Sequence, residues 1–142
     1  MKNHRSPEVD VFESLVRAAD TVTALSQTGL KGAGLTPSRY GVLAALHESG
    51  PLSPKVLAAR ILRSPGNLTL VLENLDRDGL VKRVSDPKDR RRIIVSLTET
   101  GRKLVAKVQP GHRRRIDEAM KRLTEREQET LQKICRKLVP AE

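Results

Sequence analysis

The sequence predicts a mainly α-helical fold that carries one small β-hairpin. Four Ser-Pro or Thr-Pro pairs predict helix starts, because a hydroxyl at the N-cap accepts an unpaired backbone N–H and proline suits the first helical position. Between residues 80 and 97 the apolar spacing changes from helical to alternating, which indicates two strands. A pair of short helices therefore precedes a hairpin directly. The four pairs are Ser6-Pro7, Thr36-Pro37, Ser53-Pro54 and Ser64-Pro65.

Each predicted helix has an apolar face at helical spacing. The first covers about residues 7–27 and is followed by a glycine-rich link, and the second covers about 37–48 and stops at a Gly-Pro pair. Two shorter helices cover about 54–62 and 65–77, and Gly79 ends the latter. The residues predicted to point inward from the second, third and fourth helices are Tyr40, Val42, Leu43, Leu46, Val56, Leu57, Ala58, Ile61, Leu68, Val71, Leu72 and Leu75.

The hairpin and the last helices follow. The first strand of the hairpin is predicted at about 80–85, and the turn begins at Asp86-Pro87. Thr98 is the predicted N-cap of a long helix, which the Pro-Gly pair at 110–111 should kink or interrupt. The stretch Thr124-Glu125-Arg126-Glu127 is a capping box and predicts the start of the last helix.

The chain of 142 residues is strongly basic, with 27 Lys and Arg against 17 Asp and Glu and a net charge of +10. Such a surplus attracts polyanions, chiefly nucleic acid or an anionic membrane surface. Phe12 and Tyr40 are the only aromatic residues. Because single-stranded nucleic acid is bound largely by stacking on aromatic rings, the composition favours duplex DNA.

The sequence also predicts a cytoplasmic protein of one domain. No stretch is as apolar as a signal peptide or a bilayer span, so no membrane contact is expected. A single cysteine, Cys135, suits a reducing compartment. The three histidines lie on separate predicted elements, and we predict neither a metal site nor another cofactor.

A polar helix face and a basic hairpin together indicate DNA binding. The helix at 65–77 presents short polar side chains suited to base edges in the major groove. Residues 82–92 contain six Lys or Arg and two Asp, a net charge of +4. Alone, the first could be an ordinary packed helix pair and the second a solvated turn. In sequence they predict a DNA-binding device, because a protruding arginine can enter the minor groove, where the potential is most negative.

The order and spacing of these motifs resemble the MarR family of winged-helix transcriptional regulators. The resemblance extends from Leu35-Thr36-Pro37 to Leu97-Thr98-Glu99-Thr100-Gly101. Its most specific part is the Asp-x-Arg pattern of Asp89 and Arg91, followed by a strand that ends in Leu-Thr-x-x-Gly. The resemblance implies a winged helix-turn-helix at 35–98, with dimerisation helices at 7–34 (including a linker) and 99–140.

The resemblance further implies a homodimer that binds a pseudo-palindromic operator in double-stranded DNA, usually as a repressor, and responds to a small phenolic or other anionic aromatic effector. The DNA-binding residues are then Ser64, Gly66, Asn67, Thr69, Leu70, Asn74, Lys88, Arg90, Arg91 and Arg92, with Asp89 orienting a neighbouring arginine. The implied dimerisation residues are Phe12, Leu15, Leu131, Ile134 and Leu138. Arg39 and Tyr40 would border the effector cleft, although Tyr40 also suits a plain core position.

Two departures from the family pattern lead to predictions about base readout and about the cysteine. Many members have arginines where this chain has Leu70 and Asn74. Because leucine can contact a thymine methyl but cannot bond to guanine, we expect weaker or A·T-leaning base readout. Members that sense oxidants use a cysteine in the first helix, which this chain lacks. Cys135 lies on the apolar face of the last helix and is expected to be an inert, packed thiol.

Other function classes fit the sequence less well. It contains no phosphate loop, nucleophile elbow or close acid–base pair that would predict an enzyme. An architectural protein that coats DNA would share the basic hairpin, but it would not need a helix with Asn67 and Thr69 exposed. A protein-interaction adaptor on the same scaffold should lack the arginine cluster. The sequence therefore favours a sequence-specific regulator.

Overall fold

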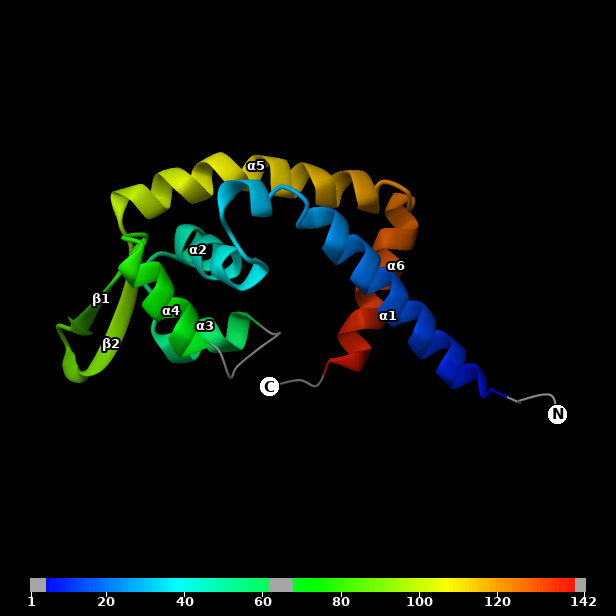
Figure 1. The fold of residues 1–142 in the computed structure, drawn as a ribbon. Helices are drawn as coiled ribbons and strands as arrows, with labels where there is room; N and C mark the ends of the chain where they lie inside the picture. Colours follow the sequence, from blue (N-terminus) through cyan, green and yellow to red (C-terminus); the bar gives the residue numbers. More distant parts are fainter. Residues whose placement is uncertain (1–4, 62–67, 140–142) are drawn as a thin grey trace. The chain divides into compact units, whose positions relative to one another are not determined.

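The computed structural model describes residues 5–61 and 68–139 (Figure 1). The chain divides into two compact units. Residues 27–111 form the first, which we call the winged unit, and the segments 1–26 and 112–142 form the second, the terminal unit. The elements in chain order are α1 (Pro7–Ser26), the 3₁₀ turn η1 (Lys31–Ala33), α2 (Pro37–Ser49), α3 (Pro54–Arg60), α4 (Leu68–Arg77), β1 (Val81–Asp86), β2 (Asp89–Leu97), α5 (Glu99–Met120) and α6 (Glu125–Leu138).

The winged unit is built on an aliphatic core to which α2, α3, α4 and both strands contribute. Leu43, Leu57, Leu75 and Val95 have no exposed surface. Complete burial of such a side chain favours folding by about 1.5–3 kcal/mol. The inward-facing residues predicted for α2 are confirmed, including Tyr40, which is 8% exposed.

The predicted N-caps of α2 and α3 are present. The Thr36 hydroxyl accepts a hydrogen bond from the backbone N–H of Arg39 at 3.2 Å, and the Ser53 hydroxyl accepts one from Val56 at 3.3 Å. Proline follows both caps, as expected. The predicted helix start at Ser64-Pro65 lies outside the described residues.

The two strands form an antiparallel hairpin whose base is attached to the core. Val81 lies opposite Leu97, and the pairing continues to a bulge between Ser85 and Asp86. Leu52 exchanges two backbone hydrogen bonds with Val95, at 3.0 and 2.8 Å. The link between α2 and α3 thus forms a single antiparallel bridge to β2 at the base of the hairpin.

The predicted inward position of Val56 is wrong, and the outer part of β2 is exposed as well. Val56 is 41% exposed, because four apolar residues at 56, 57, 58 and 61 span too wide an arc for one face of a seven-residue helix. Ile93 is 48% exposed, because the hairpin extends beyond the core and only the part near Val95 is covered.

Of the kink or interruption predicted at Pro110-Gly111, the interruption is not observed. Helix α5 continues from Glu99 to Met120 through Pro110. Proline removes one donor from the ladder of helical hydrogen bonds. The regular turns on both sides keep the helix continuous despite that loss.

The first turn of α5 approaches the turn after α4 very closely. The carbonyl of Leu80 accepts a hydrogen bond from the backbone N–H of Thr98 at 3.1 Å. The Thr98 hydroxyl donates to the carbonyl of Gly79 at 2.6 Å and accepts from the N–H of Gly101 at 3.1 Å, so Thr98 is the predicted N-cap. A Cβ atom at Gly101 would lie 2.0 Å from the Leu80 carbonyl oxygen. Only glycine fits there.

The terminal unit leaves long apolar stripes uncovered. The capping box of α6 is confirmed: Glu127 N–H donates to Thr124 at 3.2 Å, and Thr124 N–H donates to Glu127 at 2.8 Å. Cys135 is half-buried. Within the described ranges, no helix has both the length and the apolar character needed to cross a bilayer. The exposed apolar residues of α1 and α6 include Phe12, Leu15, Leu131, Ile134 and Leu138, which are 38–63% exposed.

Replacing Gly101 with alanine should destabilise the winged unit. The added methyl group meets backbone that cannot move without breaking the Thr98 hydrogen bond, so the free energy of unfolding should fall by about 1–3 kcal/mol or more. Gly32→Ala is the matched control, because nothing lies within 4 Å of a Cβ there. Urea denaturation at a fixed protein concentration compares the two, and equal midpoints would contradict the close approach.

Candidate nucleic-acid interface

Helix α4 has one buried face and one exposed, outer face. Leu72 and Leu75 are buried, whereas Thr69 and Leu70 are exposed, with 55% of Leu70 accessible. Ser64, Gly66 and Asn67, which were predicted to bind DNA from the start of this helix, lie outside the described residues.

The side chain of Asn74 is engaged within α4. Its Oδ1 atom accepts a hydrogen bond from Nη2 of Arg77 at 2.6 Å, and the residue is half-buried. An Asn–adenine pair needs the amide oxygen as an acceptor for the adenine amino group. The bond from Arg77 therefore takes one of the two lone pairs of this oxygen and restrains the orientation of the amide.

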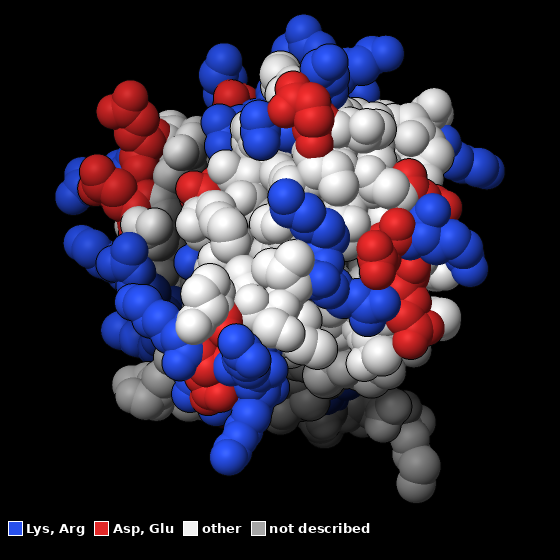
Figure 2. Space-filling view, turned by 90° about the vertical axis from the view of Figure 1, so that its left-hand side faces the viewer, with Lys and Arg blue, Asp and Glu red and all other residues white. Residues whose placement is uncertain are grey.

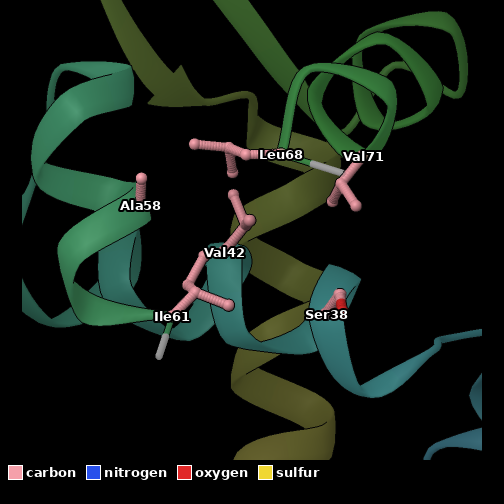
Figure 3. A pocket seen from close by; sticks show the side chains of 6 residues that line it. All are labelled: Ser38, Val42, Ala58, Ile61, Leu68 and Val71. Carbon is pink, nitrogen blue, oxygen red and sulfur yellow. The ribbon is translucent and has the colours of Figure 1, made fainter. Parts of the chain in front are cut away.

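A small apolar cavity lies between α4 and the helices beneath it. It measures about 10 Å³, room for a water molecule at most. Figure 3 shows side chains from α2 and α4 pointing toward this space. The cavity is a small gap left where α4 packs against the helices beneath it. Its lining residues are Ser38, Val42, Ala58, Ile61, Leu68 and Val71.

Two aspartates shape the tip of the hairpin. Oδ1 of Asp86 accepts from the N–H of Lys88 at 2.9 Å, and Oδ1 of Asp89 accepts from the N–H of Arg91 at 3.1 Å. The other carboxylate oxygen of Asp89 lies 3.8 Å from Nε of Arg92, an ion pair that is too long for a hydrogen bond. Asp89 thus pairs with one arginine and holds the backbone of another.

The hairpin presents several cations to solvent. Lys88, Arg90 and Arg91 are exposed and form no ion pair within the described part of the chain. Arg83 differs, because its guanidinium donates twice to Asp76 at the end of α4, at 3.2 and 3.1 Å. Figure 2 views the side of the molecule that carries the hairpin, where many Lys and Arg side chains project from the surface, with Asp and Glu side chains among them.

The two residues predicted for the effector cleft have structural partners. Tyr40 belongs to the buried core. Arg39 forms an ion pair with Asp78 after α4 and donates to the carbonyl of Gly34 at 3.2 Å. Nε of Arg39 is buried and has no acceptor among the described residues.

Sequence reasoning missed the ion pairs of Asp76 and Asp78. A signal was present, because carboxylates at the C-terminal end of a helix are opposed by the helix dipole and favour a cationic partner. The partners themselves, Arg83 and Arg39, are brought there by the fold.

The fold and this site together define a winged helix-turn-helix protein, with an exposed helix face next to a basic hairpin. The sequence model of the MarR family matches residues 33–92. A protein of Bacillus subtilis (strain 168), described as the uncharacterized HTH-type transcriptional regulator YkoM, is 32% identical over 123 residues, 87% of this chain and 80% of that protein. The chain therefore belongs to the MarR family of transcriptional regulators, and the predicted fold class and regulatory function are confirmed.

Solved structures agree with this assignment. Bordetella bronchiseptica BpsR, from a study of how 6-hydroxynicotinic acid regulates its DNA binding, is 27% identical with a TM-score of 0.81, covering 93% of this chain and 94% of that one. NadR in complex with 4-hydroxyphenylacetate is 25% identical with a TM-score of 0.77, covering 100% and 98%.

Arg91→Ala should weaken binding to duplex DNA and leave stability unchanged, because the side chain is exposed. The slope of log Kd against log salt should become shallower by about 0.9 for each phosphate that the variant no longer neutralises. Arg102→Ala is the matched control, since Arg102 is also exposed but lies on α5 and pairs with Glu99 at 2.8 Å. Titration of labelled duplex at several salt concentrations provides the measurement. Equal weakening by both variants would show that overall charge, not the hairpin, determines binding.

Proposed function

We propose that this regulator is a homodimer that represses transcription from an inverted-repeat operator until a small aromatic acid releases it. The observation that carries the proposal is the basic hairpin, whose exposed Lys88, Arg90 and Arg91 belong to the same compact unit as the exposed face of α4. Helix α4 would enter the major groove, and the hairpin would follow the adjacent minor groove.

The readout residues follow from this placement. Thr69 and Leu70 are exposed on α4, and the hairpin cations face solvent, where phosphates can reach them. Asp89 acts on the DNA indirectly by fixing the backbone of Arg91. The full proposed contact set is Ser64, Gly66, Asn67, Thr69, Leu70, Asn74, Lys88, Arg90, Arg91 and Arg92.

The exposed stripes of the terminal unit support dimerisation. Phe12 and Leu138 are each 63% exposed, and they belong to apolar rows on α1 and α6. Contiguous apolar surface of this kind marks a protein interface. A second copy of the chain would cover the stripes, and two DNA-binding units would then meet two half-sites about one helical turn apart.

An aromatic acid is the proposed effector class. BpsR and NadR, which this chain resembles, are described with 6-hydroxynicotinic acid and 4-hydroxyphenylacetate. In this chain Arg39 offers a buried Nε donor without an acceptor among the described residues. A carboxylate that reached this guanidinium would satisfy the donor and compete with Asp78 for it. Arg39, next to the buried Tyr40, is therefore the proposed contact.

Selection of bound fragments from random duplex DNA at about 150 mM salt tests the proposed function, because non-specific phosphate binding is weak there. We expect an inverted repeat with half-sites about 10 base pairs apart. Recovery of no motif, together with tight binding at low salt, would instead establish an architectural protein that coats DNA.

Leu131→Asp should convert the dimer to a monomer and abolish tight operator binding. Leu131 is 38% exposed in the single chain, so the carboxylate would disturb the subunit interface more than the core of its own chain. Val56→Asp is the matched control, because Val56 is 41% exposed and lies on α3. Sedimentation equilibrium measures the mass. A Leu131→Asp protein that remains dimeric would contradict the assignment of α6 to the interface.

A further inference from the structure

The outer face of α4 holds one large apolar side chain. Leu68 and Val71 point to the cavity under the helix (Figure 3). Because successive residues of a helix are about 100° apart, Leu70 is directed away from both. It keeps 55% of its surface exposed, whereas Leu72 keeps 3%. Leu70 therefore contributes little to the core of its own chain.

The polar neighbours of Leu70 are poorly suited to guanine or adenine. Glu73 is exposed and can only accept hydrogen bonds when ionised, whereas guanine presents two acceptors in the major groove. The amide oxygen of Asn74 accepts from Arg77 at 2.6 Å, so this one bond restrains both the residue that suits adenine and the arginine that suits guanine. Within the described part of α4, Leu70 is the large apolar side chain that can approach a base edge.

The major groove has a single apolar feature, the C5-methyl group of thymine. We propose that Leu70 determines operator specificity by packing on a thymine methyl in each half-site, and that Asn74 is a positioning residue that restrains Arg77. This proposal rests on the proposed function, in which α4 enters the major groove. It adds the base that is recognised and removes Asn74 from direct base contact.

Deoxyuridine provides a sharp test, because it differs from thymidine only by the missing methyl group. Each thymine of the selected half-site is replaced in turn, symmetrically in both half-sites, and Kd is measured at constant salt. At one position the wild-type protein should lose affinity about fourfold per half-site, the factor expected for removal of one buried methyl group. Substitution at the other thymines should have no comparable effect.

Leu70→Ala should bind the thymine and uracil operators equally well and should retain the wild-type unfolding midpoint. Val56→Ala, at an aliphatic residue of similar exposure on α3, should keep the wild-type preference for thymine. Asn74→Ala should weaken all operators by a similar factor. Loss of selectivity at one adenine in this variant would instead make Asn74 a base-reading residue and overturn its positioning role.

The outcomes separate the two proposals. If the wild-type protein selects an inverted repeat but tolerates uracil at every position, the role of Leu70 is overturned and the proposed function stands. If Leu70→Ala keeps a preference for thymine, another residue contacts the methyl group and the assignment is wrong. If no motif is selected at all, both proposals fail.

Discussion

The place where α5 begins constrains the whole winged unit. The carbonyl groups of Gly79 and Leu80, in the link between α4 and β1, accept hydrogen bonds from Thr98, which follows β2. Gly101 allows the next turn of α5 to lie against the same peptide, with no room for a Cβ atom. One junction therefore fixes the end of α4, both ends of the hairpin and the first turn of α5. An exposed, two-stranded hairpin is marginally stable by itself, so its direction depends on this attachment.

Acidic residues of the winged unit organise its cations. Asp76 and Asp78 hold Arg83 and Arg39, and the aspartates of the hairpin accept backbone N–H groups. These carboxylates lower the net charge without covering Lys88, Arg90 and Arg91. The more exposed pair, Arg83–Asp76, contributes little to stability, typically less than about 1 kcal/mol. The main effect of these carboxylates is to separate structural arginines from those that remain available to phosphate.

The sequence allowed most of the elements to be predicted, because their signals are local. Caps such as Thr36 and Thr124 and the period change at the hairpin depend only on neighbouring residues. Ion pairs such as Arg39–Asp78 join distant segments, and no local pattern specifies them. The bond between Asn74 and Arg77 is local, but it depends on side-chain rotamers that a residue pattern does not determine. Composition thus indicated which residue types form the candidate site, and the fold determined which of them form hydrogen bonds or ion pairs within the chain.

The hairpin and helix α4 have different roles in DNA binding, because different side chains remain available on each. Cations of the hairpin attract any duplex, because the phosphate charge is independent of sequence. For a chain of net charge +10, affinity alone is therefore a poor guide to the operator. Selectivity depends on groups that distinguish base edges, and within the described part of α4 the exposed set is small and partly apolar. A regulator of this kind separates its operator from competing DNA by a ratio of affinities. Higher salt lowers the affinity from phosphate contacts and leaves the apolar contact of α4 largely unaffected, so it increases the share of binding that depends on sequence.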